Sequence, residues 1–219
     1  MAAKPFHHGN LRAVLLEQAE AMLREEGVEG LSLRELARKA GVSHGAPRSH
    51  FIDRQALLDA LAEQGFNRLT GSVRAALQTP GTFQDRFRLV GRAYVEFAVE
   101  DAALMDLMFT AKVDAPAGPV QDAAIRLFQV FDNALSRDSP DDHSRENAWG
   151  RLQLVFAATM QGTATLIAAR RITRSQAETL IDDAVDMMLG SEIGARVLPH
   201  PARGDRGRSV AEAADQVAE

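Results

Sequence analysis

Polar and basic side chains gather between residues 30 and 54 of this 219-residue chain, where they could donate hydrogen bonds to an anionic partner. The segment carries five cations against two acids: Arg34, Arg38, Lys39, Arg48 and Arg54 against Glu35 and Asp53. Its net charge is therefore +3, although the whole chain has a net charge of −5. A local positive patch on an acidic chain is the pattern expected where phosphate groups bind.

Two short helices joined by a tight turn must position these side chains. Ser32 stands three residues before Glu35, which is the spacing of a capping box and predicts that a helix starts after Ser32. Gly41 supplies the positive φ of a turn, and Ser43 is predicted to cap the next helix, over residues 43–50. Ala37 is small where the two helices must cross. This is the pattern of a helix-turn-helix motif, whose second helix enters the DNA major groove.

Composition limits the alternatives. The chain is 46% hydrophobic and 25% charged, which is typical of a globular protein, and it contains no cysteine. Disulfides, thiolate nucleophiles and cysteine metal sites are therefore excluded. The sequence has no run of 18 apolar residues and no apolar secretory signal at its start, so we expect a cytoplasmic protein without a membrane partner.

Helical periodicity continues to about residue 194, and no segment has the alternation typical of a strand. The prediction is an all-α fold of about nine helices, with a three-helix DNA-binding domain over residues 1–52 and a helical ligand-binding and dimerisation domain over residues 53–194. Residues 195–219 are rich in Pro, Gly and charge and are predicted to be disordered. The expected helices span residues 11–26, 33–40, 43–50, 53–78, 83–100, 102–111, 119–137, 142–171 and 174–190.

The span from Asn10 to about Ala62, and above all "GVSHGAPRSHFIDRQALLDAL", resembles the DNA-binding domain of the tetracycline-repressor (TetR) family of bacterial transcriptional regulators. The segments "WGRLQLVFAATMQGTATL" and "LMDLMF" resemble a subgroup whose C-terminal domain is named for Trp, His and Gly. Gln161 stands where that subgroup usually has His. The resemblance implies operator DNA as partner and a homodimer.

Nine residues occupy positions that the resemblance assigns to DNA binding: Ser32, Arg34, Ser43, His44, Gly45, Arg48, Ser49, His50 and Arg54. Among them, Ser32, His50 and Arg54 are implied to contact phosphates, and Arg54 replaces the family's usual lysine. Arg48 stands where the family usually has tyrosine. Its role stays open between a phosphate contact and bidentate recognition of a guanine.

Ten Phe, Tyr and Met side chains recur at helical spacing in the C-terminal half and are candidates to line an effector cavity: Phe87, Tyr94, Phe97, Met105, Met108, Phe109, Phe128, Phe131, Phe156 and Met160. Most such residues pack in a core, and a minority could form an adaptable apolar wall. Polar Glu96, Asp106, Gln161 and Thr163 could orient a ligand or simply face solvent or a dimer interface. Trp149 is expected to pack rather than bind.

Dimerisation is expected through the last two long helices, residues about 144–190. Small residues there allow close approach, and apolar ones form a stripe: Ala157, Gly162, Ala164 and Ala168, then Leu180, Ile181, Val185, Met188 and Leu189.

The combined prediction is a transcriptional repressor released from a palindromic operator by an apolar or amphipathic small molecule. It requires no cofactor, no metal and no catalytic step, because the sequence lacks a phosphate-binding glycine loop, H-E-x-x-H and G-x-S-x-G. His7 and His8 are expected to be solvated. Two alternatives remain open: a small helical enzyme using an acidic and histidine site such as "DDHSRE" at 141–146, and an interaction module that no longer binds DNA.

Overall fold

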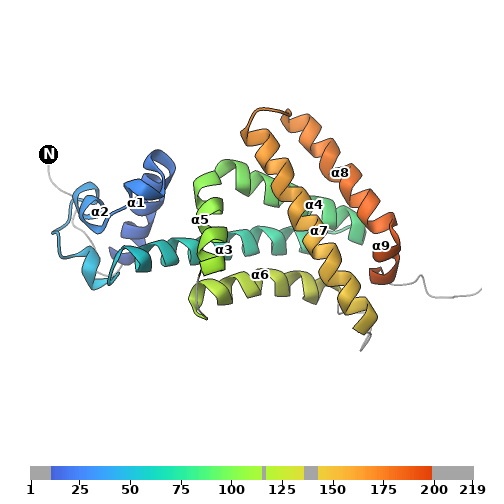
Figure 1. Ribbon diagram of the computed structural model, residues 1–219, viewed down its shortest axis with the longest axis horizontal. Coiled ribbons are helices and arrows are strands. Elements are labelled where there is room, and N and C mark those ends of the chain that lie inside the picture. The colour runs from blue at the N-terminus through green and yellow to red at the C-terminus, as the bar shows by residue number, and fades with distance from the viewer. Residues whose placement is uncertain (1–10, 115–116, 136–142, 199–219) are drawn as a thin grey trace, which may run out of the picture.

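The computed structural model describes residues 11–114, 117–135 and 143–198, and every regular element in these ranges is helical (Figure 1). Helices α1 to α3 begin the chain and six further α-helices follow. A small group of helices lies at one end of an elongated molecule, and a larger bundle forms the rest (Figure 1).

The small group, here called the head, comprises residues 11–53. It contains α1 (Leu11–Glu26), the 3₁₀ turn η1 (Val28–Gly30), α2 (Leu33–Lys39) and the 3₁₀ turn η2 (Pro47–Ser49). Helix α1 buries one face, including Leu15, Ala19 and Leu23, in the same hydrophobic core as Leu36 and Phe51, and this core continues into the rest of the chain. Gly27 ends α1 with φ +71°, as its position in the sequence predicts.

Helix α3 (Arg54–Gln78) joins the head to the larger bundle, here called the body. The Asp53 carboxylate caps its start by accepting the Ala56 amide at 2.8 Å. Its buried face runs from Leu57 through Phe66 to Val73 and packs against α4, α5 and α6 (Figure 1). One continuous helix therefore connects the head to the body.

The body consists of α4 (Phe83–Glu100), α5 (Ala102–Asp114), α6 (Pro119–Leu135), α7 (His143–Ala168), α8 (Arg174–Gly190) and α9 (Glu192–Val197). Reciprocal capping boxes start two of them: Thr82 with Asp85 before α4, and Thr173 with Gln176 before α8. Helix α8 packs on α4 and α7, so the two long helices nearest the C-terminus cover the bundle on one side (Figure 1).

The all-α prediction is confirmed, and most predicted helices lie within a few residues of the observed ones. Two differences matter. Residues 43–50 do not form an α-helix, and α9, which was not predicted, extends three residues into the segment expected to be disordered. Ser191 starts α9 by accepting the Gly194 amide, a capping signal close to a glycine-rich tail. Residues 199–219, Asn10 and the histidines at 7 and 8 lie outside the described residues.

Candidate DNA-binding site and effector cavity

The first half of the motif forms as its sequence predicts. The Ser32 hydroxyl accepts the Glu35 amide at 3.1 Å and starts α2. The Glu35 carboxylate binds Arg38 instead of returning to the backbone of Ser32. Ala37 is fully buried, and Gly41 turns the chain with φ +66°. Since only glycine adopts this φ at little cost, the turn depends on Gly41.

The second half is tighter than an α-helix. The Ala46 amide bonds to the Ser43 carbonyl, Arg48 to Gly45 and Ser49 to Ala46, all with the three-residue spacing of a 3₁₀ helix. Pro47 explains the difference, because it has no N–H with which to close a four-residue bond to Ser43. The expected helix over residues 43–50 is therefore replaced by a turn that leads into η2.

Most of the residues that the resemblance assigns to DNA binding are exposed. Eight of the nine are exposed, and only Ser32 is half-buried: Arg34, Ser43, His44, Gly45, Arg48, Ser49, His50 and Arg54. Pro47 is buried beneath them and Phe51 is 2% exposed, so the exposed segment rests on an apolar base. This segment lies at the end of the molecule farthest from α8 and α9 (Figure 1).

The five cations of the segment divide into two groups. Arg38 pairs with Glu35, which raises the pKa of Arg38 and lowers that of Glu35. Lys39 binds Glu26 at 2.6 Å and Glu25 at 3.2 Å, and these hydrogen bonds raise its pKa. These cations are already neutralised by acids of the head.

Arg54 has a structural partner as well. Its Nε donates to the Leu31 carbonyl at 2.8 Å and its Nη2 to the Val28 carbonyl at 2.6 Å, which ties the start of α3 to the loop before α2. Arg34 and Arg48 differ, because neither has an ion-pair or hydrogen-bonding partner among the described residues. They are the two exposed cations of this segment that remain available to an external anion.

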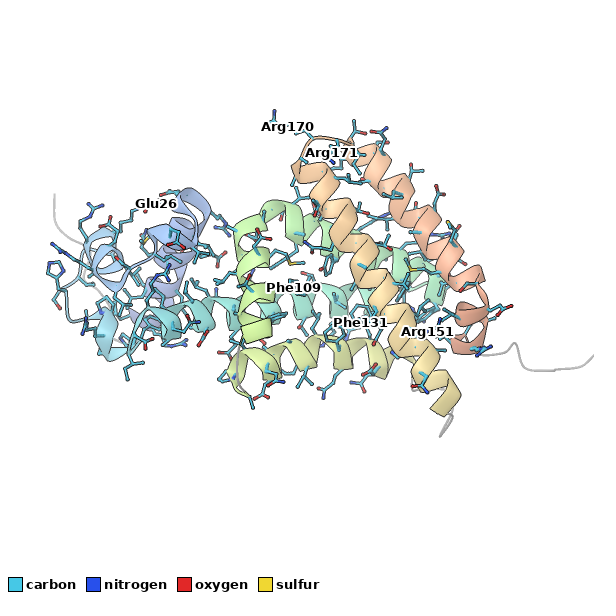
Figure 2. All side chains as sticks on the ribbon, in the orientation of Figure 1. Glu26, Phe109, Phe131, Arg151, Arg170 and Arg171 are labelled. Carbon is cyan, nitrogen blue, oxygen red and sulfur yellow. The ribbon has the colours of Figure 1, made fainter. Side chains whose placement is uncertain are left out.

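A small apolar cavity of about 40 Å³ lies inside the body among α3, α4, α5, α6 and α7. Six predicted residues line it: Phe87, Tyr94, Phe109, Phe128, Phe131 and Phe156. Four further lining residues were not predicted: Val73, Leu127, Gln153 and Ala157. Three of them are aliphatic and one is an amide, so a search restricted to Phe, Tyr and Met could not find them. Figure 2 marks Phe109 on α5 and Phe131 on α6.

Four candidate lining residues lie elsewhere in the body. Met108 packs against Gly65 and Met160 against Gly91, where helices approach closely. The Arg68 guanidinium carbon lies over Phe97, 5.3 Å from the centre of its ring, and Met105 is 1% exposed in the core. Their helical spacing is the same as that of the cavity residues, because core and cavity share helix faces.

Polar groups next to the cavity bond to one another. The Tyr94 hydroxyl donates to Gln161 Oε1 at 3.0 Å, and burial raises the pKa of this phenol, so it stays neutral. Trp149 Nε1 and Gln153 Nε2 both donate to Asp132 Oδ1, at 2.8 and 3.0 Å. Trp149 is also in contact with the Phe87 and Phe131 rings, as expected of a packing residue.

The other polar candidates face away from the cavity or bond to the backbone. Glu96 pairs with Arg174 at 3.0 Å, Asp106 is exposed, and Thr163 donates to the carbonyl of Thr159.

Comparison with known protein families gives one match in the head and the start of α3, and a second match in the body. Residues 15–61 match a model described as bacterial regulatory proteins, tetR family, and residues 87–190 match a tetracyclin repressor-like C-terminal domain. The chain belongs to the TetR family. It is therefore a DNA-binding transcriptional regulator with the family's all-α fold. The resemblance to the Trp-His-Gly subgroup is not confirmed and stays a prediction.

Individual relatives agree with this family. A class C tetracycline repressor protein of Escherichia coli is 44% identical over 52 residues, 24% of each protein, so the match spans about a quarter of that repressor. The transcriptional regulator BetI of Pectobacterium atrosepticum is 27% identical over 161 residues, covering 69% of this chain and 81% of BetI. A solved protein of unknown function from Rhodococcus sp. RHA1 is 38% identical, with a TM-score of 0.71 over 85% of this chain and 97% of that chain.

The outer face of α7 and α8 in this TetR-family chain is partly apolar. Leu154, Val155, Leu180 and Met187 are exposed, Met187 by 76%. The predicted stripe is wrong for Ile181, Val185, Met188 and Leu189, which are all buried within the chain's own core. Both faces of α8 carry apolar side chains, and the sequence pattern identified the inner one.

Within the described ranges, no helix is long and apolar enough to cross a bilayer, and no three metal-ligating side chains converge. The "DDHSRE" stretch of the enzyme alternative lies outside the residues whose side chains are described.

Proposed function

We propose that this TetR-family regulator is a cytoplasmic homodimeric repressor that binds a palindromic operator and leaves it when a small uncharged molecule enters the body. Residues 1–52 act as the DNA-binding part and residues 53–194, with α9, as the effector-binding and dimerisation part. No cofactor or catalytic step is required. The observation that carries the DNA-binding assignment is the pair Arg34 and Arg48, two exposed cations that form no ion pair or hydrogen bond with the described residues.

Arg34 and the exposed 43–50 segment then face the operator. Arg48 is the main candidate for base recognition because a guanidinium fork matches the O6 and N7 acceptors of guanine. Ser43, His44, Gly45, Ser49 and His50 offer small or polar groups beside it. The Ser32 hydroxyl accepts the Glu35 amide and still has its own proton to donate to a phosphate.

Arg54 contributes in another way. Its guanidinium holds the Leu31 and Val28 carbonyls, so we assign it a supporting role in place of the phosphate contact implied by the resemblance. Its positive charge still lies beside the DNA-facing segment and attracts phosphates without touching them.

A dimer supplies the second head. Palindromic half-sites place two recognition elements about 34 Å apart, whereas each chain carries one. The exposed apolar residues Leu154, Val155, Leu180 and Met187 support pairing through the outer face of α7 and α8. This choice retains the predicted helices and Leu180, and it replaces the other four residues of the predicted apolar stripe.

The effector is uncharged and largely aromatic or aliphatic. Seven of the ten cavity-lining residues are aromatic or leucine, and none of the ten carries a charge. A cavity of about 40 Å³ holds only a few waters, far less than the ~300 Å³ typical of a ligand site. An effector must therefore push the surrounding helices apart, and this expansion supports a coupling between effector and operator binding.

A duplex-selection experiment tests the proposal. Wild-type protein is incubated with random duplex DNA, bound sequences are amplified, and binding of the selected duplex is measured by fluorescence anisotropy. A palindromic motif with one dimer per site is expected. Recovery of no preferred sequence would reject operator binding and favour the interaction module.

Effector binding has a matched test. Neutral aromatic probes such as indole and naphthalene should raise the melting temperature and weaken operator binding of the wild type. Phe128→Trp adds volume beside the cavity without charge, so this variant should keep its operator affinity and lose both responses. Equal responses of wild type and variant would place the effector site elsewhere.

A further inference from the structure

Four charged side chains from three parts of the chain form a closed ring between head and body. Glu20 and Arg24 belong to α1, Arg68 to α3, and Asp101 follows the last residue of α4. Each arginine contacts both carboxylates. Arg24 Nε donates to Asp101 Oδ1 at 2.7 Å and its Nη2 binds Glu20, while the two Nη atoms of Arg68 bind Glu20 and Asp101.

The carboxylates of this ring are buried and its arginines are not. Side-chain exposure is 9% for Glu20 and 5% for Asp101, against 49% for Arg24 and 38% for Arg68. Burial opposes the charged form of Arg68, but its hydrogen bonds and attraction to Glu20 and Asp101 outweigh this and raise its pKa. Two acids facing two bases leave no net charge in the contact. Removing one acid would leave a partly buried positive charge without compensation.

The ring joins helices that line the effector cavity to the helix that supports the DNA-facing segment. Helix α4 carries Phe87 and Tyr94 into the cavity and ends just before Asp101, and α5 begins just after it and carries Phe109. The Arg68 guanidinium also lies over the Phe97 ring of α4. Helix α1 contacts α5 beside the ring. A displacement of α4 and α5 by an effector must therefore stretch this contact or carry α1 with it.

We propose that Glu20, Arg24, Arg68 and Asp101 are positioning residues for operator binding, which hold the head at the angle that the closed body favours. None of them belongs to the DNA-facing segment, yet operator affinity depends on them. This inference rests on the proposed function for its direction: the cavity is nearly filled here, so the ring belongs to the effector-free, DNA-binding arrangement.

Operator affinity of ring variants is the first test. Glu20→Gln and Asp101→Asn keep side-chain size and remove the charge, and Arg24→Gln alters the most exposed member in case the other two fold poorly. We expect dissociation constants raised about 5- to 150-fold, the usual range of coupling between sites. The slope of affinity against salt should not change, because the number of phosphate contacts stays the same.

Two controls separate positioning from lost stability. Stoichiometric titration gives the active fraction, which should stay near that of the wild type while the dissociation constant rises. Glu96→Gln breaks the exposed Glu96–Arg174 pair within the body and should leave operator affinity unchanged. In a double-mutant cycle, the effects of Glu20→Gln and Asp101→Asn should not add, because the two acids share both arginines. Additive effects, or wild-type affinity in all three single variants, would overturn the inference.

A distance measurement tests the ring without DNA. The chain has no cysteine, so spin labels at Glu29→Cys in the head and Glu178→Cys in the body are specific. Labelled protein is diluted with unlabelled protein so that one protomer of a dimer carries both labels. The distance between the two labels should have a narrow distribution when all four ring residues are present. The distribution should be broader after Asp101→Asn. If wild type selects no operator, the proposed function fails while this measurement still decides the ring; identical distributions would reject the ring alone.

Discussion

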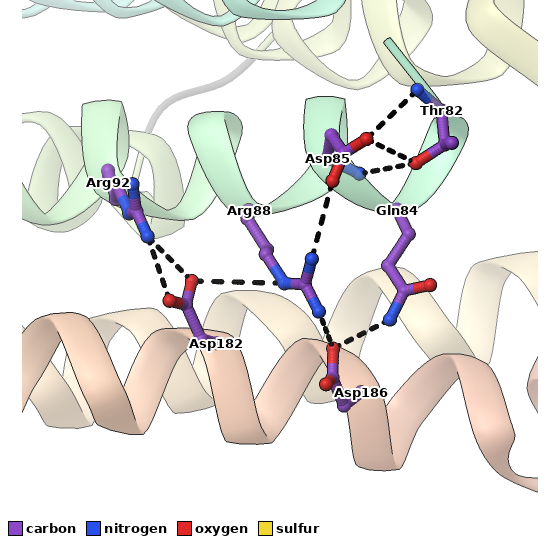
Figure 3. Close-up of polar contacts among 7 residues, drawn as sticks. All are labelled: Thr82, Gln84, Asp85, Arg88, Arg92, Asp182 and Asp186. Atoms are coloured by element: carbon purple, nitrogen blue, oxygen red, sulfur yellow. Dashed lines mark hydrogen bonds and ion pairs between the residues drawn. The ribbon is translucent and has the colours of Figure 1, made fainter.

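The arginines of the head and those of α4 have the same chemistry and different surroundings. Arg34 and Arg48 are exposed and form no ion pair or hydrogen bond with the described residues, whereas Arg92 binds both carboxylate oxygens of Asp182 and Arg88 binds Asp186 on α8 (Figure 3). Arg88 and Arg92 therefore have their counter-charges within the fold. The comparison indicates that a cation's function here depends on whether the fold supplies its partner.

The largest expected effect comes from removing an unpaired cation. Arg48→Ala should weaken operator binding by about 1 to 3 kcal/mol if Arg48 recognises a guanine, with the loss concentrated on the selected sequence. A phosphate contact would instead weaken binding to all duplexes and lower the salt slope by about one. Fluorescence anisotropy at several salt concentrations measures both quantities.

Arg92→Ala is the matched control because it removes the same charge from the paired group. Its operator affinity should equal that of the wild type. Equal affinities for Arg48→Ala and Arg92→Ala would contradict the placement of the DNA-facing segment.

Sequence patterns predicted much of this head and less of its chemistry. Ser32 and Gly41 signal a helix start and a turn through local backbone requirements, and both act as predicted. The expected helix over residues 43–50 fails at Pro47, because a helix this short cannot absorb the loss of a backbone donor.

Pairing is a different matter, since it depends on residues far apart in the chain. Arg54 and the Val28 carbonyl are 26 residues apart, and Arg24 and Asp101 are 77 apart. A count of local charge therefore includes cations that already have hydrogen-bonding or ion-pair partners within the fold. The cavity shows the same limit, because periodicity identifies the inner face of a helix without separating core from cavity wall.

Close packing at Gly91 is a second feature that fixes the position of α4 against its neighbours. A Cβ at this position would lie 2.8 Å from Cγ2 of Ile181 and 2.9 Å from Sδ of Met160. Gly91→Ala should lower the free energy of unfolding by about 1 to 3 kcal/mol, because Ile181 is branched and buried and cannot easily move. Chemical denaturation measures this change.

Gly71→Ala provides the comparison, since nothing lies within 4 Å of a Cβ at that helical position. It should stabilise the protein by about 0.5 to 1 kcal/mol through the better helix propensity of alanine. If both variants shift stability in the same direction, close helix packing at Gly91 is not what fixes α4.

A smaller effect is expected from Arg54, the cation that the head uses internally. Arg54→Ala removes two hydrogen bonds from a charged donor to backbone carbonyls and should destabilise the protein by about 1 to 2 kcal/mol. Arg48→Ala should leave the denaturation midpoint unchanged. A midpoint that falls equally in both variants would show that Arg48 also has a structural role.

The smallest effect concerns the exposed charges between α4 and α8. Hydrogen bonds from Gln84 and Arg88 hold the pKa of Asp186 below its ordinary value of 3.8 (Figure 3). A carboxylate with a lowered folded pKa stabilises the protein above its unfolded pKa, and this contribution is lost as the pH falls through the folded value. Asp186→Asn should therefore lower the melting temperature slightly at pH 7, and the difference from wild type should shrink as the pH falls below 3.8. Salt at 1 M should reduce it as well, since the pair is exposed. Asp183→Asn alters an exposed neighbour on the same helix and serves as the control. A difference that persists at low pH would assign the effect to the amide's packing instead of to the charge.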